Sequence, residues 1–218
     1  MKDTYRSMIP PFLFHALKVW EGNTQLRKWQ QQGSPLPPPH IVKQTAIKEF
    51  YESFGYEVLV ETGTYLGEMV EAQKRRFKRV YSIELSEELH ARATKRFRRD
   101  KQVTIVLGDS GKTLPLIMDQ LDKPAIFWLD GHYSDGITAR GEKDCPIFEE
   151  LDAIFSGKPL DHVLLIDDAR CFVGQGDYPT IEALTAFVLS KRPHYQLEVK
   201  NDIIRYFPTA HSSNHLES

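Results

Sequence analysis

The chain alternates short apolar runs with longer stretches of helical pattern, and this alternation is the feature that most constrains its fold. Runs rich in β-branched, aliphatic and aromatic residues occur at 58–60, 80–83, 103–107, 126–129 and 163–166. Helical patterns occur at 41–54, 67–78, 86–99, 110–121, 146–156 and 179–191. Short apolar runs separated by helices are typical of buried parallel strands, and right-handed crossovers then place helices on both faces of the sheet. The sequence therefore predicts an α/β fold.

The pattern changes after the last of these helices. Residues 195–199 and 203–207 are two further strand-like runs, and they are separated by Asn201 and Asp202. Both residue types are suited to tight turns. We therefore expect a β-hairpin that closes an otherwise parallel sheet.

The N-terminal region differs in composition from the rest of the chain. Residues 1–33 mix aromatic and polar side chains and predict one amphipathic helix that ends near Gly33. The proline-rich run at 34–39 cannot be helical, because proline removes backbone donors and restricts the residue before it. We expect a helical extension and connector at 1–39, one compact domain at 40–208 and a polar tail at 209–218, which suits a chain of 218 residues.

Composition excludes several other classes of protein. The formal net charge is −2, which gives no general signal for binding polyanions. The two cysteines, Cys145 and Cys171, lack CxxC spacing, so neither a zinc site nor a disulfide framework is indicated. The apolar stretch at 12–17 is too short to span a bilayer and has no cleavage site after it. We expect a cytoplasmic protein with reduced thiols and no membrane partner.

Ligands of open α/β sheets bind outside the carboxyl ends of the strands, so the residues after each strand are the candidates for a site. The first predicted strand leads into the sequence Glu61-Thr62-Gly63-Thr64-Tyr65-Leu66-Gly67. Two glycines four residues apart allow a sharp turn and a close approach to a ligand. The turn is neither GxGxxG nor a Walker loop, so pyrophosphate is not the expected ligand. An ordinary strand–helix turn without a ligand is the alternative.

Acidic residues follow the second and third strands. Glu84 lies 21 residues after Gly63, the distance at which a carboxylate usually meets a ribose diol. Asp109 and Ser110 could accept a hydrogen bond from the exocyclic amine of adenine. The alternatives are a surface glutamate before the helix entry at Ser86 and a helix cap at Asp109 or Ser110.

Three aspartates follow the fourth and fifth strands. Asp130 comes directly after 126–129, and the pair Asp167-Asp168 comes directly after 163–166. Such carboxylates repel one another unless a cation or a basic group neutralises them. Three hard oxygen ligands suit Mg²⁺. Alternatively, one aspartate caps a loop and another pairs with Arg170.

Acidic or hydroxyl-bearing residues after five successive strands, together with the terminal hairpin, resemble the class I S-adenosylmethionine-dependent methyltransferases over roughly residues 41–207. The resemblance implies a Rossmann-like seven-stranded sheet of order 3-2-1-4-5-7-6, with the last strand antiparallel and helices on both faces. It implies that the first turn lies against the methionine part of the cofactor, Glu84 against the ribose and Asp109 against the adenine. The full predicted cofactor set is Glu61, Thr62, Gly63, Thr64, Gly67, Glu84, Asp109, Ser110 and Asp130.

A narrower resemblance is to the metal-dependent sugar O-methyltransferases of the macrocin type, which carry Asp-Gly-Asp after strand four and Asp-Asp after strand five. It implies that Asp130, Asp167 and Asp168 hold Mg²⁺. His132 stands where the family has the aspartate that is thought to act as the base. The first turn also departs, since it reads Glu-Thr-Gly rather than glutamate, a hydrophobic residue and glycine.

The resemblance predicts a Mg²⁺-assisted methyl transfer from S-adenosylmethionine to a hydroxyl of a sugar or another small polar acceptor. A divalent ion would lower the pKa of the hydroxyl, and His132 would remove its proton as the catalytic base. A hydrogen-bonding loop histidine is the alternative. The loop at 133–145 is interpreted either as a lid over the acceptor or as a plain connector.

Three other functions remain open at this point. One is a binding protein that has kept the fold and lost turnover, and another is a hydroxylase built on the same fold. The third is a nucleic-acid methyltransferase, because residues 74–101 are rich in Lys and Arg. Few aromatic residues such as Phe77 and Phe97 interleave with these basic residues, so nucleic acid is not the expected partner. The sequence does not decide between a monomer and a homo-oligomer.

Overall fold

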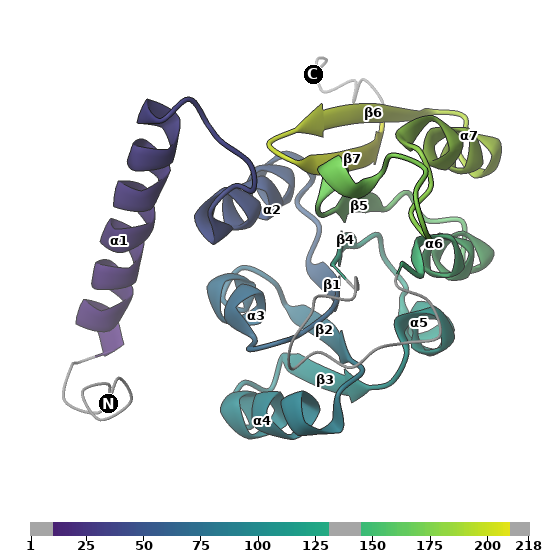
Figure 1. The fold of residues 1–218 in the computed structure, drawn as a ribbon. Coiled ribbons are helices and arrows are strands. Elements are labelled where there is room, and N and C mark those ends of the chain that lie inside the picture. The colour runs from purple at the N-terminus through teal and green to yellow at the C-terminus, as the bar shows by residue number, and fades with distance from the viewer. Residues whose placement is uncertain (1–10, 131–144, 210–218) are drawn as a thin grey trace, which may run out of the picture.

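The computed structural model describes residues 11–130 and 145–209. Figure 1 shows its α-helices, which are α1 (Pro11–Gln31), α2 (His40–Phe54), α3 (Glu68–Gln73), α4 (Glu87–Phe97), α5 (Ser110–Gln120), α6 (Ile147–Ser156) and α7 (Ile181–Lys191). The strands are β1 (Val58–Thr62), β2 (Arg79–Glu84), β3 (Val103–Leu107), β4 (Ile126–Leu129), β5 (Val163–Ile166), β6 (Tyr195–Lys200) and β7 (Ile203–Pro208). A short 3₁₀-helix, η1 (Ala169–Cys171), follows β5.

The strands form one sheet in the order β3-β2-β1-β4-β5-β7-β6. Neighbouring strands from β3 to β5 pair in parallel, and β7 runs antiparallel to both β5 and β6. The predicted strand order and the antiparallel last strand are therefore confirmed. The hairpin turn uses Asn201 and Asp202 with φ of 54° and 63°, the left-handed conformation that two-residue hairpin turns require.

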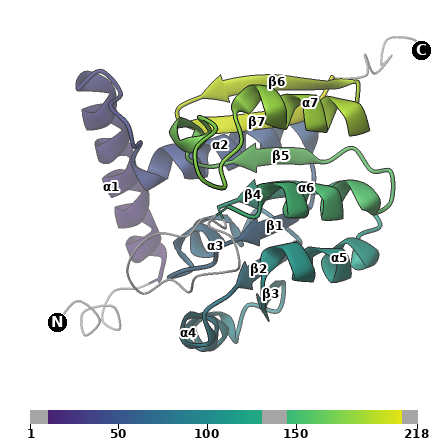
Figure 2. The ribbon, with the colours of Figure 1, turned by 45° about the vertical axis from the view of Figure 1, so that its right-hand side comes forward.

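Alternate residues of the central strands point to opposite faces of the sheet, and each face carries its own core. Val60, Phe127 and Leu164 pack with the apolar sides of α5, α6 and α7. Their chain neighbours Leu59 and Trp128 pack with α2, α3 and α4 on the other face. Figures 1 and 2 show these two helix layers with the sheet between them. Burial on both faces explains why these strands read as continuous apolar runs.

The N-terminal helix lies beside α2, outside the two layers that cover the sheet (Figure 2). Trp29 is buried near its end, and the indole Nε1–H donates to the Pro35 carbonyl oxygen over 2.7 Å. This bond folds the connector back on the helix. The expected helix end near Gly33 agrees with the observed end at Gln31, whereas the division of the chain at residues 39 and 40 stays a prediction.

The helix after β1 is shorter than the sequence pattern predicts. It ends at Gln73, although the pattern continues to residue 78. The backbone N–H groups of Lys78 and Arg79 donate to the Glu57 carbonyl oxygen over 2.9 and 3.2 Å. These bonds begin the pairing of β2 with β1, and they require the chain to leave the helix several residues earlier.

None of the helices within the described residues is both long and apolar enough to cross a bilayer.

His162, directly before β5, makes the fold sensitive to acid. Its side chain is buried, its Nδ1 accepts the Ala125 backbone N–H over 3.1 Å, and its ring lies edge-on to Phe127. Burial lowers the pKa of this imidazole to about 4, and the charge of Arg192 contributes to the lowering. The imidazole is therefore neutral in the folded protein at neutral pH.

We predict that His162 reduces the free energy of unfolding as the pH falls from about 6.5 to about 4. In that range the unfolded chain binds a proton that the folded chain excludes, at a cost of roughly 1 kcal/mol per pH unit. Urea unfolding of the wild type and His162→Gln at several pH values measures this, and the variant should show a flatter dependence. The half-exposed His194 provides the control as His194→Gln. Identical slopes for the wild type and His162→Gln would refute the prediction.

Candidate active site

The residues predicted from the strand ends lie along one edge of the sheet. Thr62 is in register with Leu129, and Leu129 is in register with Ile166. The backbone N–H of Asp130 donates to the Thr62 carbonyl oxygen over 3.2 Å, and that of Asp167 donates to the Leu129 carbonyl oxygen over 3.1 Å. The backbone hydrogen bonding between β1, β4 and β5 therefore extends to Asp130 and Asp167, the first residues after β4 and β5.

The turn after β1 requires its glycines. Gly63 and Gly67 have φ of 84° and 73°, in the left-handed region that side chains disfavour. A Cβ on Gly67 would lie 2.6 Å from Cε2 of Phe97, so α4 packs directly on the backbone there. The N–H groups of Gly63 and Thr64 donate to the Ile83 carbonyl oxygen over 3.0 and 3.1 Å. The turn is thus fixed against both β2 and α4.

Glu61 lies inside the edge rather than on its surface. Its carboxyl group is buried, and the Ser82 hydroxyl donates to Oε2 over 2.5 Å. Burial raises its pKa to about 8, against the lowering effect of the Ser82 hydrogen bond, and the negative charges of Asp130 and Glu84 also act to raise it. Glu61 is therefore mainly neutral at neutral pH. It lies buried in the protein interior beneath the glycine turn.

Glu84 joins the glycine turn to the entry of α4. Its side chain is 5% exposed, Oε2 accepts the Tyr65 backbone N–H over 2.7 Å, and Oε1 accepts the Ser86 backbone N–H over 2.9 Å. Ser86 itself caps α4, as the sequence indicated, but Glu84 is buried and is not the surface glutamate of the alternative interpretation. A carboxylate oxygen has more than one acceptor direction, so both oxygens of Glu84 are still able to accept from a ligand.

Asp109 caps α5, since its Oδ1 accepts the Gly111 backbone N–H over 2.9 Å. Ser110 is the first residue of that helix. Both residues lie after β3 at the same edge, because the Gly108 N–H donates to the Glu84 carbonyl oxygen over 2.9 Å. The capping contact agrees with the alternative drawn from the sequence, and a role toward adenine stays a prediction.

The aspartates after β4 and β5 surround a lysine that the sequence analysis missed. The Lys43 Nζ contacts Oδ2 of Asp167 and lies 3.5 Å from Oδ1 of Asp168. Asp167 is fully buried. Its burial and the nearby charge of Asp130 raise the pKa of this carboxyl group to about 7, and the charge of Lys43 acts to lower it. Asp168 also accepts a bond of 2.9 Å from Arg170, as the alternative interpretation anticipated.

The residues present fit this ammonium better than they fit Mg²⁺. Among residues 11–130 and 145–209, no three His, Cys, Asp or Glu side chains are grouped so that they could hold a metal ion. Lys43 occupies one oxygen of Asp167 and approaches one of Asp168, so a cation already neutralises the pair. The ammonium thus takes the place that the sequence prediction gave to the metal ion.

His40 is a second residue that sequence reasoning missed. It begins α2, one turn before Lys43, and its Nδ1 lies 2.7 Å from Nε2 of Gln44. Partial burial and the charge of Lys43 lower the pKa of the imidazole, while Glu68 and Asp130 act in the opposite direction. The spacing of His40 and Lys43 was visible in the sequence, but no motif connected this helix with the strand ends. His132, the predicted base, lies outside the described residues.

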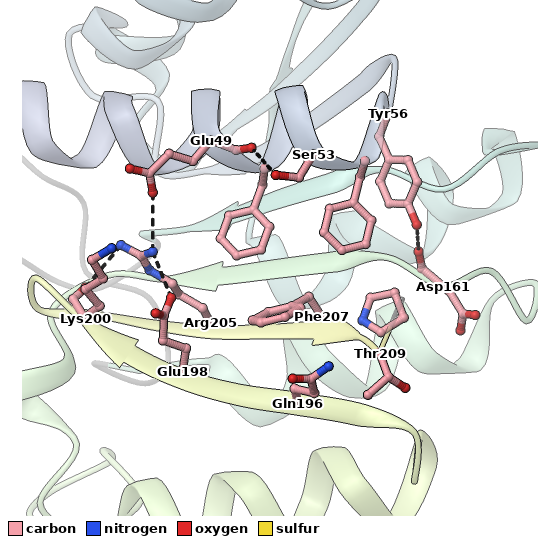
Figure 3. Close-up of a pocket in the computed structure, with 13 residues that line it drawn as sticks. Glu49, Ser53, Tyr56, Asp161, Gln196, Glu198, Lys200, Arg205, Phe207 and Thr209 are labelled. Atoms are coloured by element: carbon pink, nitrogen blue, oxygen red, sulfur yellow. Dashed lines mark hydrogen bonds and ion pairs between the residues drawn. The ribbon is translucent and has the colours of Figure 1, made fainter. Parts of the chain in front are cut away.

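A separate hollow of about 700 Å³ lies between the second half of α2 and the face of the β6–β7 hairpin. Figure 3 shows Phe207 in its floor and Arg205 at one end, paired with Glu49 and Glu198 over 3.5 and 3.0 Å. The hollow lies on a face of the sheet, away from the loops that follow β1, β2 and β4. Sequence reasoning did not anticipate it.

No family model matches the sequence, and no curated protein matches it either. Solved structures do match the fold. The O-methyltransferase TomG of Streptomyces achromogenes, solved with S-adenosylmethionine, has a TM-score of 0.57 and 15% identity over 87% of this chain and 89% of its own. An O-methyltransferase from Bacillus cereus with S-adenosylhomocysteine has a TM-score of 0.57 and 14% identity over 86% and 90%.

A third similar structure is the S-adenosylhomocysteine-bound methyltransferase PaMTH1 of Podospora anserina. Its TM-score is 0.55, with 14% identity over 93% of this chain and 97% of the other. At such identities the likeness concerns the fold. The chain therefore has the Rossmann-like fold of class I methyltransferases, with the strand order that the sequence predicted.

We predict that Gly67→Ala lowers the free energy of unfolding by about 3 kcal/mol, because the left-handed backbone disfavours any Cβ and the methyl group meets Phe97. Gly55→Ala is the matched control, since Gly55 has φ of 66° and open space around it. It should lose only roughly 1 kcal/mol. Urea denaturation of both variants measures the difference, and equal losses would contradict the close packing of α4 on the turn.

Proposed function

We propose that this protein is an S-adenosylmethionine-dependent methyltransferase that methylates a hydroxyl oxygen of a small polar acceptor such as a sugar. The observation that carries the proposal is the position of Glu84. Its nearly buried carboxylate lies at the end of β2 and holds the glycine turn through the Tyr65 N–H. An acidic group beside such a turn is placed to bind the vicinal hydroxyls of a ribose.

The other proposed cofactor contacts follow the same edge. Gly63, Thr64 and Gly67 would contact the methionine part, because the turn they form follows β1 and is bonded to the end of β2 beside Glu84. Asp109 and Ser110 would contact the adenine from the start of α5. Glu61 and Thr62 act from behind the turn, since both side chains are buried.

The charge of the edge suits a sulfonium cofactor. Asp130 and Glu84 place negative charge beside the glycine turn, because both act to raise the pKa of Glu61 at the start of that turn. A negative potential favours the positively charged donor over its neutral thioether product. Product release after transfer would therefore be electrostatically favoured.

The proposed reaction is an in-line displacement at the methyl carbon. A bond forms between the acceptor oxygen and the methyl carbon while the carbon–sulfur bond breaks, and the electron pair of that bond remains on sulfur. The hydroxyl proton leaves to a base, and His132 is the base predicted from the sequence. Binding donor and acceptor side by side supplies the alignment that this displacement requires. The proposed reaction uses no divalent ion, because the Lys43 ammonium already contacts Asp167 and approaches Asp168.

Two observations agree with a small acceptor. The similar structure TomG is described as involved in tomaymycin synthesis. Some of the basic residues of 74–101 also have acidic partners. Examples are Lys74 with Asp100 at 2.9 Å, Arg79 with Asp122 at 2.7 Å and Arg96 with Glu68 at 2.9 Å.

We predict that the wild type binds S-adenosylhomocysteine and that Glu84→Gln weakens this binding by about tenfold or more. The substitution removes the charge from the hydrogen bonds to the ribose, a loss of roughly 1.5–3 kcal/mol. Isothermal titration calorimetry measures both affinities. Glu88→Gln is the control, because Glu88 is an exposed residue in the first turn of α4.

Absence of binding by the folded wild type would reject the proposed function. Equal affinities of the wild type and Glu84→Gln would reject the assignment of the ribose site to Glu84.

A further inference from the structure

We propose that the Lys43 ammonium is the built-in cation beside Asp167 and Asp168, so that the protein needs no divalent metal at these carboxylates. A second role of Lys43 rests on the proposed function. During methyl transfer, the same ammonium would donate a hydrogen bond to the acceptor oxygen as the acceptor hydroxyl loses its proton.

The contacts of Lys43 are the first support for this role. Its Nζ contacts Oδ2 of Asp167 and lies 3.5 Å from Oδ1 of Asp168. The Lys43 side chain is 17% exposed and that of Asp167 is 0% exposed, so water screens the pair weakly. Arg170 donates to the same Oδ1 of Asp168 over 2.9 Å. The two carboxylates therefore already have two cationic partners from the chain itself.

The position of Lys43 in α2 is the second support. It lies in the first turn of the helix, where the exposed backbone N–H groups create a positive potential that disfavours a cation. The first turn of α2 contains no acidic residue that would offset this. A lysine at an unfavourable helix position needs compensation elsewhere, and the carboxylates after β5 supply it.

The packing of α2 fixes where the ammonium can reach. Val42, Ala46, Ile47 and Phe50 are buried on the helix face that covers the sheet. Ala46 and Ile47 are one turn after Lys43 and are 1% and 0% exposed. The backbone that carries Lys43 is therefore held by the core, which keeps the ammonium close to Asp167. A fixed charge of this kind stabilises a developing negative charge without reorganisation.

A divalent ion would compete with this arrangement. Mg²⁺ requires near-octahedral oxygen ligands, and it would have to displace the ammonium from Asp167 or lie beside it. The positive charges of Mg²⁺ and the ammonium would repel each other strongly in this position, because little water is present to screen them. Removing the ammonium should therefore expose carboxylates that are able to attract a hard cation.

Mn²⁺ is the probe that tests the proposal, because its electron paramagnetic resonance signal distinguishes free from bound ion. We expect the wild type to bind Mn²⁺ with a dissociation constant above about 1 mM. Lys43→Met keeps the length and apolar stem of the side chain and removes its charge, and we expect it to bind Mn²⁺ at least about tenfold more tightly. Lys43→Arg keeps a cation and should resemble the wild type. Lys48→Met is the matched control, because Lys48 is an exposed residue of the same helix.

Tight Mn²⁺ binding by the wild type would overturn the proposal, and this measurement needs no variant to fold. A folded Lys43→Met variant without increased affinity would also overturn it. Adding Asp168→Asn to Lys43→Met should abolish the gained affinity if the ion binds at these carboxylates, and retained affinity would place the ion elsewhere and overturn the assignment. Titration of the wild type with S-adenosylhomocysteine decides the proposed function separately, since it does not depend on Mn²⁺.

Discussion

The ion pair between Lys43 and Asp167 joins the helix before the first strand to the end of the fifth strand. Parallel strands in register bring the residues that follow them together, whatever the charge of those residues. The architecture of the candidate site therefore depends on this ion pair, because the residues brought together here are carboxylates. Carboxylates after β4 and β5 would destabilise this edge without a neighbouring cation. Lys43 supplies the positive charge from α2, and Arg170 supplies a second one within the loop after β5. The strand order thus determines which side chains meet, and the charges of the chain determine whether they are stable together.

The same edge separates two kinds of acidic residue. Glu61 and Asp167 are buried, and their pKa values are raised mainly by the loss of hydration. Glu84 is instead held by two backbone N–H groups that flank the glycine turn. Backbone donors around a carboxylate orient its oxygens. This difference favours Glu84 as the residue that binds a ligand, whereas Glu61 supports the turn from within.

The sheet could be predicted from the sequence because its determinants are local or periodic. Runs such as 126–129 are apolar on both faces, and Asn201-Asp202 specifies a tight turn by itself. The convergence of Asp130 and Asp167 followed from topology. Lys43 could not be predicted, since its partners lie more than a hundred residues away and nothing local distinguishes it from Lys48. The sequence analysis required a cation or a basic group beside these carboxylates, and the structure has the Lys43 ammonium there. The hollow between α2 and β7 also depends on packing that no periodic pattern describes.

The central claim is that the strand ends around the glycine turn form the cofactor site. The most direct test is an amide NMR titration of the isotope-labelled protein with S-adenosylhomocysteine. We predict that the amide signals of Tyr65, Ser86 and Gly111 shift on binding, because these N–H groups donate to Glu84 and Asp109. Signals of Ser53 and Gln196, which line the separate hollow, should stay in place. Shifts confined to Ser53 and Gln196 would contradict the claim and move the ligand site to the face of the β6–β7 hairpin.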